Sequence, residues 1–194
     1  AAGVQEWDFV EFITDSGKPY EENGVIISDP GHALEFVGLA AQFCSVVMDA
    51  DSATKGEKEE ALRIAQLLPK IFIRNFTNGF DHRHGGIVKL WDLVARKPVN
   101  ADLPWWSIIE AMRAAIGCIP FTSDVAEQSL LYDAYGSCFN ALFLHYVSDK
   151  SGFCIQARDE KGNISDTIPA VPDADPNYHT GLPLIFCCEK ITGL

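Results

Sequence analysis

Apolar residues recur at three- and four-residue spacing along most of the chain, and several stretches are almost entirely apolar. This spacing is typical of helices that bury one face, and the apolar stretches are typical of helices buried on all sides. The pattern predicts five helices, at residues 31–50, 57–74, 105–118, 124–147 and 178–192. We therefore expect a mainly helical, all-α protein.

Four shorter segments have the composition of β-strands, at residues 5–13, 24–28, 86–91 and 152–157. Turn-forming sequences lie beside two of them, at Asp15-Ser16-Gly17 and Lys161-Gly162-Asn163. We expect these strands to form short β-hairpin excursions between the helices.

A proline stands just before or at the start of three helical runs, at Pro30, Pro104 and Pro176, with intervals of 74 and 72 residues. A proline at the first helical position, beside a capping Asp or Asn, signals a helix start. Each interval holds an inner helix, an outer helix and an excursion, which makes the repeating unit an αα-hairpin.

Stacked αα-hairpins can curve into a toroid whose inner helices direct their N-termini to one rim. Three repeats, beginning near residues 30, 104 and 176, form an arc, because a closed toroid of six hairpins takes about twice this length. We expect residues 1–194 to be a single domain that covers half of such a barrel.

Composition narrows the class of protein. Of the 194 residues 47% are hydrophobic and 22% charged, which is typical of a globular domain. A net charge of −12, with no run of Lys or Arg, argues against nucleic acid as a partner. No run of about 18 consecutive apolar residues occurs, which argues against a membrane span.

The chain has six cysteines, mostly inside apolar helical runs: Cys44, Cys118, Cys138, Cys154, Cys187 and Cys188. Adjacent cysteines such as Cys187 and Cys188 rarely form a disulfide. The pattern therefore predicts reduced thiols and a non-oxidising, cytoplasmic location.

His32 is the third residue of its predicted helix if Asp29 is the N-cap and Pro30 the first helical residue. The positive end of the helix dipole disfavours the imidazolium there, so a neutral imidazole can accept a proton as a general base. Glu35 lies on the same face of the helix, where it could orient that imidazole or bind a sugar hydroxyl.

His179 has an equivalent place after Pro176 and beside Tyr178, so two histidines from different repeats are expected to face one cavity. Epimerisation next to a carbonyl removes a proton from one face of a carbon and returns one to the opposite face. Two acid/base groups that flank the substrate can perform both steps.

Trp105 and Trp106 can offer flat apolar surface to the C–H face of a sugar ring, and Glu110 can accept hydrogen bonds from hydroxyl groups. Arg113, three residues after Glu110, is predicted to form an ion pair with it. This combination indicates a site for a mono- or disaccharide.

Each of these residues also has a structural explanation. A histidine at a helix start often caps it, Glu35 could compensate the helix dipole, and the tryptophans could pack in the core. The segment Asp81-His82-Arg83-His84 has metal-ligand spacing but the surroundings of a turn, and His145 is expected in the core. With no glycine-rich phosphate loop or serine nucleophile elbow either, we expect no metal and no cofactor.

Four segments resemble the motifs of one enzyme family. They are Asp29-Pro30-Gly31-His32-Ala33-Leu34-Glu35, Asn78-Gly79-Phe80-Asp81 with Gly85-Gly86, Trp105-Trp106 through Glu110-Ala111-Met112, and Tyr178-His179. They are similar to the Pro-Gly-His-x-x-Glu segment, the glycine-flanked hairpin, the Trp-Trp-x-x-x-Glu-Ala segment and the C-terminal aromatic-His of the N-acylglucosamine 2-epimerase family. That family includes cellobiose 2-epimerases and aldose-ketose isomerases.

The resemblance implies an (α/α)6 barrel of which this chain is the C-terminal half, and proton transfer at C2 of a ring-opened sugar without a metal. It maps the acid/base pair onto His32 and His179, and places Glu35, Trp106 and Glu110 in the sugar pocket. In two places the sequence departs from the family. Thr180-Gly181-Leu182-Pro183 follows the last histidine where a Pro-Arg pair is frequent, and Phe36 replaces the usual Trp.

The leading hypothesis is a sugar 2-epimerase or aldose-ketose isomerase. A catalytically silent carbohydrate-binding or interaction protein is one alternative, and a glycoside hydrolase that uses Glu35 and Glu110 as its carboxylate pair is another. A half-barrel exposes apolar inner-helix surface. We therefore expect either a missing N-terminal half or a homodimer that joins two arcs into one ring.

Overall fold

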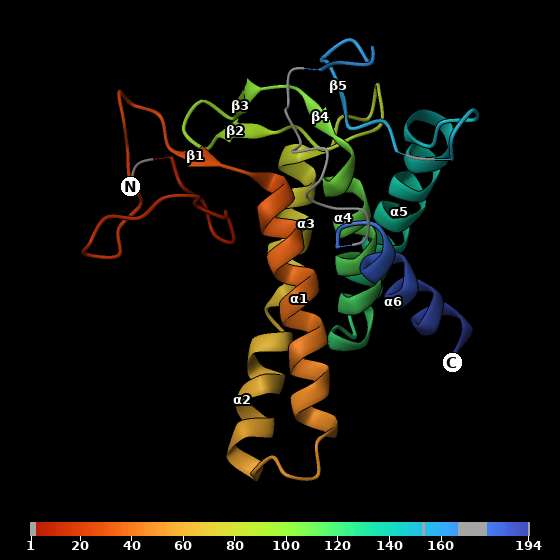
Figure 1. Cartoon of the computed structure of the whole chain (residues 1–194). Coiled ribbons are helices and arrows are strands. Elements are labelled where there is room, and N and C mark those ends of the chain that lie inside the picture. The colour runs from red at the N-terminus through yellow and green to blue at the C-terminus, as the bar shows by residue number, and fades with distance from the viewer. Residues whose placement is uncertain (1–2, 153, 167–177, 194) are drawn as a thin grey trace.

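A computed structural model describes residues 3–152, 154–166 and 178–193, and these residues are mostly helical, as predicted (Figure 1). The helices are α1 (Pro30–Asp49), α2 (Lys55–Ala65), α3 (Leu68–Gly79), α4 (Trp105–Cys118), α5 (Val125–Ala141) and α6 (Gly181–Thr192). A 3-10 turn, η1 (Ile119–Phe121), follows α4, and a π-helical turn, η2 (Leu142–Tyr146), follows α5.

The start of α1 is as the sequence predicts. Asp29 is the N-cap, and its Oδ1 accepts hydrogen bonds from the backbone amides of Gly31 at 2.9 Å and His32 at 3.3 Å. Pro30 occupies the first helical position, where the amide hydrogen that it lacks has no partner in any helix.

The single helix predicted at residues 57–74 is wrong, because the structure has two helices there. Thr54 and Glu57 form a capping box that begins α2, and α2 ends at Ala65. Pro69 lies in the first turn of α3. A proline cannot donate the hydrogen bond that would continue a preceding helix, so the chain breaks and starts again.

The start of α4 is as predicted, whereas the last helix begins later than predicted. Pro104 is the N-cap of α4 and lies in a short strand just before it, and α4 has the predicted bounds of residues 105–118. The helix predicted at residues 178–192 begins at Gly181, with Thr180 as its N-cap. The predicted start near Pro176 lies outside the described residues.

The strands are short and form two antiparallel sheets. One sheet contains β1 (Ile27–Ser28), β2 (Leu90–Asp92) and β3 (Lys97–Asn100), and the other contains β4 (Leu103–Pro104) and β5 (Ala157–Arg158). The strand predicted at residues 5–13 is wrong. That segment, which the structure describes throughout, has strand-like pairing only at an isolated bridge from Ile13 to Pro19. The sequence pattern did not predict β3 and β4. β3 forms a short hairpin with β2, and its sequence, Lys97–Asn100, lacks strand-forming alternation, whereas β4 is defined by its pairing with the distant β5.

The helices form two rows (Figure 1). In the first row α4 packs between α1 and α6, and in the second α3 packs against α1 and α5 against α4. Every residue of α4 except Trp106 is buried, so this helix is the centre of the core. Both sheets lie at the end of the rows where α1 and α4 begin.

All six cysteines are free thiols. Burial raises the pKa of the Cys118 and Cys138 thiols, and it raises that of Cys187 to about 12, with a smaller contribution from neighbouring Cys188. These thiols are therefore protonated near neutral pH and act as small apolar core groups.

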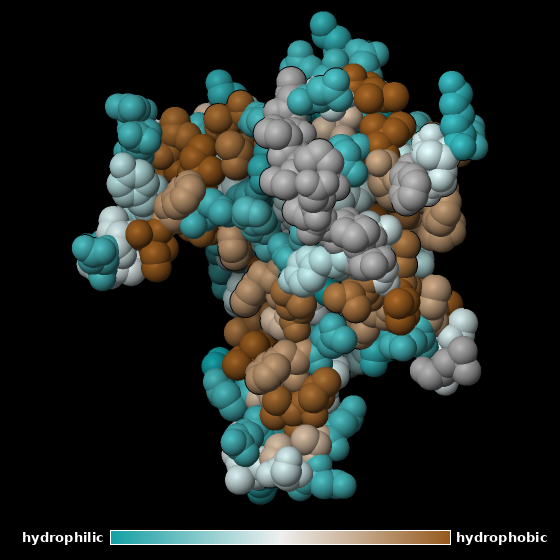
Figure 2. Space-filling view, in the orientation of Figure 1, coloured by the Kyte–Doolittle hydropathy of each residue, from teal (hydrophilic) through white to brown (hydrophobic). Residues whose placement is uncertain are grey.

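One face of α1 is apolar and exposed, with Phe36, Leu39, Phe43 and Val46 between 39% and 67% accessible. Apolar side chains gather over this helix in the space-filling view (Figure 2). Among the described helices α1 is the one long and apolar enough to cross a membrane, a property that it shares with core helices of soluble proteins. Its other face packs against α2, α3 and α4.

Candidate active site

The first turns of α1 and α4 and the turn before α6 bring together one tryptophan and two histidines. The rings of His32 and Trp106 are stacked, with centroids 5.5 Å apart, and the His179 ring lies 5.2 Å from that of Trp106. The structure thus places around one aromatic side chain two histidines that are far apart in the sequence. Trp106 follows His32 by 74 positions, and His179 follows His32 by 147. Trp106 is also the residue of α4 that the core leaves uncovered.

Gly31 makes this close approach possible. A Cβ atom at this position would lie 2.7 Å from Cη2 of Trp106 and 3.0 Å from Cβ of Ser107. Any larger residue would push the start of α4 away from that of α1. The glycine of the Pro-Gly-His segment is therefore required by packing, because its φ is not in the left-handed region.

The His32 side chain is held by carboxylates on its Nδ1 side. Oε1 of Glu11 lies 2.9 Å from Nδ1, and Oδ2 of Asp29 lies 3.5 Å from it. Glu35, which the sequence suggested as the orienting group, is not among these partners. Glu11 was not predicted, because it precedes His32 by 21 residues in a segment expected to be a strand.

Lys89 is a second site residue that the sequence analysis missed. Its Nζ donates a hydrogen bond to Oδ2 of Asp29 at 2.5 Å and lies 5.3 Å from the centre of the Trp106 ring. Lys89 thus neutralises the carboxylate that caps α1 and packs on the same tryptophan as both histidines. Lys89 comes three residues after the glycine-flanked motif that ends at Gly86, and this motif was the sequence signal that could have pointed to it.

His179 is held by Glu110, whose Oε1 lies 2.8 Å from Nδ1 of the imidazole. Oε2 of Glu110 accepts a very short hydrogen bond from Arg113, so the predicted ion pair is present. The Glu110 side chain is fully buried and the Arg113 side chain is 3% exposed. Glu110 therefore contacts His179 and Arg113 and presents no surface to solvent, contrary to the expectation that it would meet hydroxyl groups directly.

His179 precedes the N-cap of α6, so it does not lie in the first turn of a helix as His32 does. The repeat predicted equivalent helix-start positions for His32 and His179, and this prediction is wrong for His179. Even so, a carboxylate from another part of the chain fixes each ring at Nδ1, Glu110 of α4 for His179 and Glu11 for His32.

Glu35 lies on the His179 side of the site. Its Oε1 is 4.0 Å from Nδ1 of His179. Burial raises the pKa of the Tyr178 hydroxyl, and the charge of Glu35 and a hydrogen bond to it raise the pKa further. Tyr178 is 45% exposed and meets the edge of His179 with ring centroids 4.7 Å apart. Glu35 and Tyr178 are thus polar groups at an accessible edge.

Trp105 belongs to the core, which corrects the expectation that both tryptophans offer their faces to a sugar. It is 6% exposed, and its Nε1 donates a long hydrogen bond of 3.4 Å to Oγ1 of Thr180. This bond joins the start of α4 to the turn that carries His179.

Two clusters contain possible metal ligands, one within this site and one outside it. Glu35, Glu110 and His179 each offer an atom within 4.8 Å of the others. The Arg113 guanidinium already provides a positive charge at Glu110, so this cluster is better explained as a set of ion pairs.

At the other cluster, Oδ2 of Asp81 lies 2.9 Å from Nδ1 of His84, and Oδ1 accepts from the amides of residues 83 and 84. In the described residues this is an ordinary turn cap, without a third metal ligand. His145, expected in the core, is exposed. Partial desolvation and the charge of Arg158 lower its pKa.

An arc of paired helices with this arrangement is the fold of carbohydrate epimerases and isomerases. The chain is similar to the D-mannose isomerase crystal structure (TM-score 0.63, 19% identity), to a sugar epimerase from a ruminal bacterium (0.66, 16%) and to the cellobiose 2-epimerase of Spirochaeta thermophila DSM 6192 (0.52, 13%). The predicted fold class, part of an α/α toroid, is therefore confirmed.

The chain belongs to the N-acylglucosamine 2-epimerase family, whose family model matches residues 2–181. No curated protein sequence gives a significant match. The three solved structures align with 86%, 94% and 86% of this chain, and the chain spans 37%, 41% and 38% of their respective lengths.

Proposed function

We propose that this chain carries the acid/base pair of a sugar 2-epimerase or aldose-ketose isomerase. The observation that carries the proposal is the pair of imidazoles, His32 and His179, on one partly buried tryptophan, each held at Nδ1 by a carboxylate. Both the family and the structural neighbours are carbohydrate epimerases and isomerases, which supports it.

The carboxylates suit these histidines to proton transfer. A carboxylate beside Nδ1 favours the tautomer that carries its hydrogen on Nδ1, so the lone pair resides on Nε2. Nε2 of one histidine can then remove the proton from C2 of an open-chain sugar. This leaves an enediolate and a protonated first histidine. The other histidine, when it is an imidazolium with a hydrogen on Nε2 and its charge balanced by the carboxylate at Nδ1, returns a proton to the carbon, and no step requires a metal or a cofactor.

The same site can support two outcomes. Return of a proton to the opposite face of C2 gives the epimer, whereas protonation at C1 gives the ketose. Both reactions share the first step, removal of the C2 proton. The side chains that surround the far side of the sugar determine which product forms, and we propose that these come from the remainder of the toroid.

We propose that Trp106, Tyr178 and Glu35 bind the sugar. Trp106 presents a flat apolar ring between the histidines, which suits the C–H groups of a carbohydrate. Glu35 and the Tyr178 hydroxyl lie at the accessible edge beside His179, where they can bond to sugar hydroxyls. Glu110 and Arg113 act indirectly, by holding His179.

The burial of Glu110 disfavours glycoside hydrolysis. A hydrolase needs two carboxylates that reach the glycosidic oxygen and the anomeric carbon. Glu110 is fully buried, and its two oxygens bind His179 and Arg113. The histidine pair therefore explains the site better than a Glu35 and Glu110 pair.

We propose that further toroid helices, from the same polypeptide or from a second copy, cover the exposed apolar faces of α1 and α6. On α6, Leu182, Ile185 and Ile191 are 55–58% exposed, in addition to the α1 residues described above. Light scattering of the isolated chain should show self-association. A stable monomer that does not aggregate would contradict this assembly.

Turnover can be tested with the sugars of the related enzymes as probes: D-mannose, cellobiose and N-acetylglucosamine. The complete protein and the isolated chain are incubated with each sugar, and the products are separated by chromatography. Formation of a C2 epimer or a ketose supports the proposal. Calorimetric sugar binding without conversion by the complete protein would favour the catalytically silent binding protein instead, and release of a monosaccharide from cellobiose would favour a hydrolase.

A further inference from the structure

The carboxylate that binds His32 comes from the segment that precedes its helix. Oε1 of Glu11 lies 2.9 Å from Nδ1, whereas the Asp29 carboxylate is 3.5 Å away. Asp29 is also committed elsewhere, because its oxygens accept hydrogen bonds from the first amides of α1 and from Lys89. Glu11 is therefore the group that forms the hydrogen bond to Nδ1.

The way in which Glu11 is buried does not favour the stability of the fold. Its Oε2 is buried and, within the described part of the chain, has no hydrogen-bond partner. A buried carboxylate oxygen without a partner costs free energy, and such a group in a folded protein needs a reason. The bond between Glu11 and the His32 ring provides one, because it sets which ring nitrogen carries the hydrogen.

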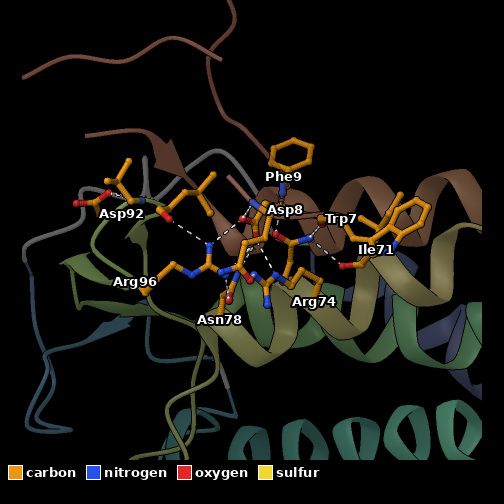
Figure 3. A network of polar contacts seen from close by, with 12 residues as sticks. Trp7, Asp8, Phe9, Ile71, Arg74, Asn78, Asp92 and Arg96 are labelled. Atoms are coloured by element: carbon orange, nitrogen blue, oxygen red, sulfur yellow. Dashed lines mark hydrogen bonds and ion pairs between the residues drawn. The ribbon is translucent and has the colours of Figure 1, made fainter. Parts of the chain in front are cut away.

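A network of polar contacts fixes the backbone three residues before Glu11 (Figure 3). The Asp8 side chain is fully buried, with Oδ1 2.7 Å from Nε of Arg74 and Oδ2 2.7 Å from Nη1 of Arg96. Asn78 also donates to Oδ1 at 3.2 Å. These three partners belong to α3 and to the β2–β3 turn, so Asp8 ties the N-terminal segment to the helical core.

Asn75 of α3 holds the same segment through its backbone. Its Oδ1 accepts from the amide of Phe9 at 3.1 Å, and its Nδ2 donates to the carbonyl of Trp7 at 2.9 Å. Trp7 has a φ of +68°, a left-handed conformation that residues with side chains rarely adopt. Beyond it, the amide of Glu11 donates to the Ile27 carbonyl at 2.9 Å, so the backbone is fixed on both sides.

From this geometry we propose that Glu11 is a positioning residue for His32. Its carboxylate accepts the hydrogen of Nδ1 and so fixes the neutral tautomer whose Nε2 carries the lone pair. The Asp8 network holds Glu11 at this distance. The segment of residues 5–11 is then part of the catalytic apparatus, although it is neither helix nor strand.

The effect on turnover rests on the proposed function, whereas the effect on the tautomer does not. If the complete enzyme is active, Glu11→Ala should lower kcat about 100-fold, because the base is held in the wrong form. KM should change little, because Glu11 acts through His32 and not on the sugar. Glu11→Gln should retain most of the activity, because its amide oxygen can still accept from Nδ1.

The tautomer is measured on the chain itself by long-range ¹H–¹⁵N correlation of the histidine ring nitrogens, at a pH where His32 is neutral. His32→Gln assigns the signals. The wild type and Glu11→Gln should show His32 with its hydrogen on Nδ1, and Glu11→Ala should lose this pattern. Glu21→Ala, which removes an exposed carboxylate between this segment and β1, should retain it.

Identical His32 signals in the wild type and Glu11→Ala would overturn the proposal, whatever the activity. If circular dichroism shows that Glu11→Ala has lost helix, Glu11→Asp replaces it, because the shorter side chain withdraws the carboxylate by one methylene. Loss of the Nδ1 hydrogen pattern in Glu11→Asp then supports the proposal, and its persistence contradicts it. Normal tautomers with no sugar turnover would reject the proposed function alone.

Discussion

Nδ1 of His179 lies 2.8 Å from Oε1 of Glu110, a fully buried carboxylate whose other oxygen binds Arg113. His32, in contrast, is held by Glu11, whose side chain is 20% exposed. Hydrogen bonds are electrostatically stronger inside a protein than near water. Each imidazole is therefore held by a carboxylate, but the carboxylate at His179 is the more deeply buried. The effect of Glu110 on catalysis can be separated from its effect on stability.

Glu110→Met, which removes the acceptor for Nδ1 of His179, should lower both stability and turnover. It leaves the Arg113 guanidinium buried without its counter-charge, which costs about 3–5 kcal/mol in the free energy of unfolding. Urea denaturation measures this loss, and the sugar conversion assay measures the loss of turnover.

The double variant Glu110→Met/Arg113→Met separates the two effects. It removes the orphaned charge, so stability should recover by about 2 kcal/mol or more relative to the single variant. Turnover should stay low, because His179 still lacks its carboxylate. Recovery of turnover together with stability would show that Glu110 is a structural residue only.

The two adjacent tryptophans should respond differently to the same substitution. Trp105→Phe loses core packing and the hydrogen bond to Thr180, so it should cost about 1–2 kcal/mol of stability. Trp106→Phe should cost less stability but about tenfold in kcat/KM, because it shrinks the ring between the histidines. Equal losses of activity in the two variants would argue against a sugar platform at Trp106.

Gly31 and Gly56 are a matched pair, since each is the second residue of a helix. Gly31→Ala places a Cβ 2.7 Å from Trp106 and should cost about 1–3 kcal/mol together with most of the activity. No atom lies within 4 Å of a Cβ at Gly56, so Gly56→Ala should raise stability by about 0.5–1 kcal/mol. Full activity in Gly31→Ala would contradict the described packing of the site.

Asp8 should make stability depend on acid pH. Burial raises its pKa, but hydrogen bonds from Arg96, the amide of Gln5, Arg74 and Asn78 outweigh this and hold the pKa below its ordinary value of 3.8. A depressed pKa means that ionised Asp8 stabilises the fold above pH 4, and that this contribution disappears as the pH falls through the folded-state pKa.

Asp8→Asn should therefore cost about 3 kcal/mol at pH 7 and show a smaller further loss than the wild type between pH 4 and pH 2. Urea denaturation across this range measures both effects. Asp133→Asn, at an exposed position of α5, should follow the wild-type curve. Parallel curves for Asp8→Asn and the wild type below pH 4 would show that Asp8 does not titrate with the fold.

The sequence predicts the helices well because their signals are local. Asp29 and Pro30 define the start of α1, and periodicity defines α4. The predictions fail where distant residues decide the structure. The segment of residues 5–13 has the composition of a strand, yet contacts with α3 hold it in an irregular form. A periodic pattern also gave no sign of the break at Pro69.

The site could be predicted in part for the same reason. His32, Glu35, Trp106 and His179 stand in short motifs, and the structure brings them together. Their partners could not be predicted, because Glu11 and Lys89 reach His32 and Asp29 from other parts of the chain. Trp105 differs from Trp106 only in the direction of its side chain, which adjacent positions in a sequence do not reveal.

The central claim is that His32 and His179 transfer the C2 proton of a sugar. The direct measurement is deuterium incorporation at C2, followed by NMR during incubation of the converted sugar with the complete protein in D2O. The wild type and His82→Ala, which alters an exposed histidine outside the site, should incorporate deuterium at equal rates. His32→Ala and His179→Ala should each abolish exchange, and undiminished exchange in either variant would contradict the account.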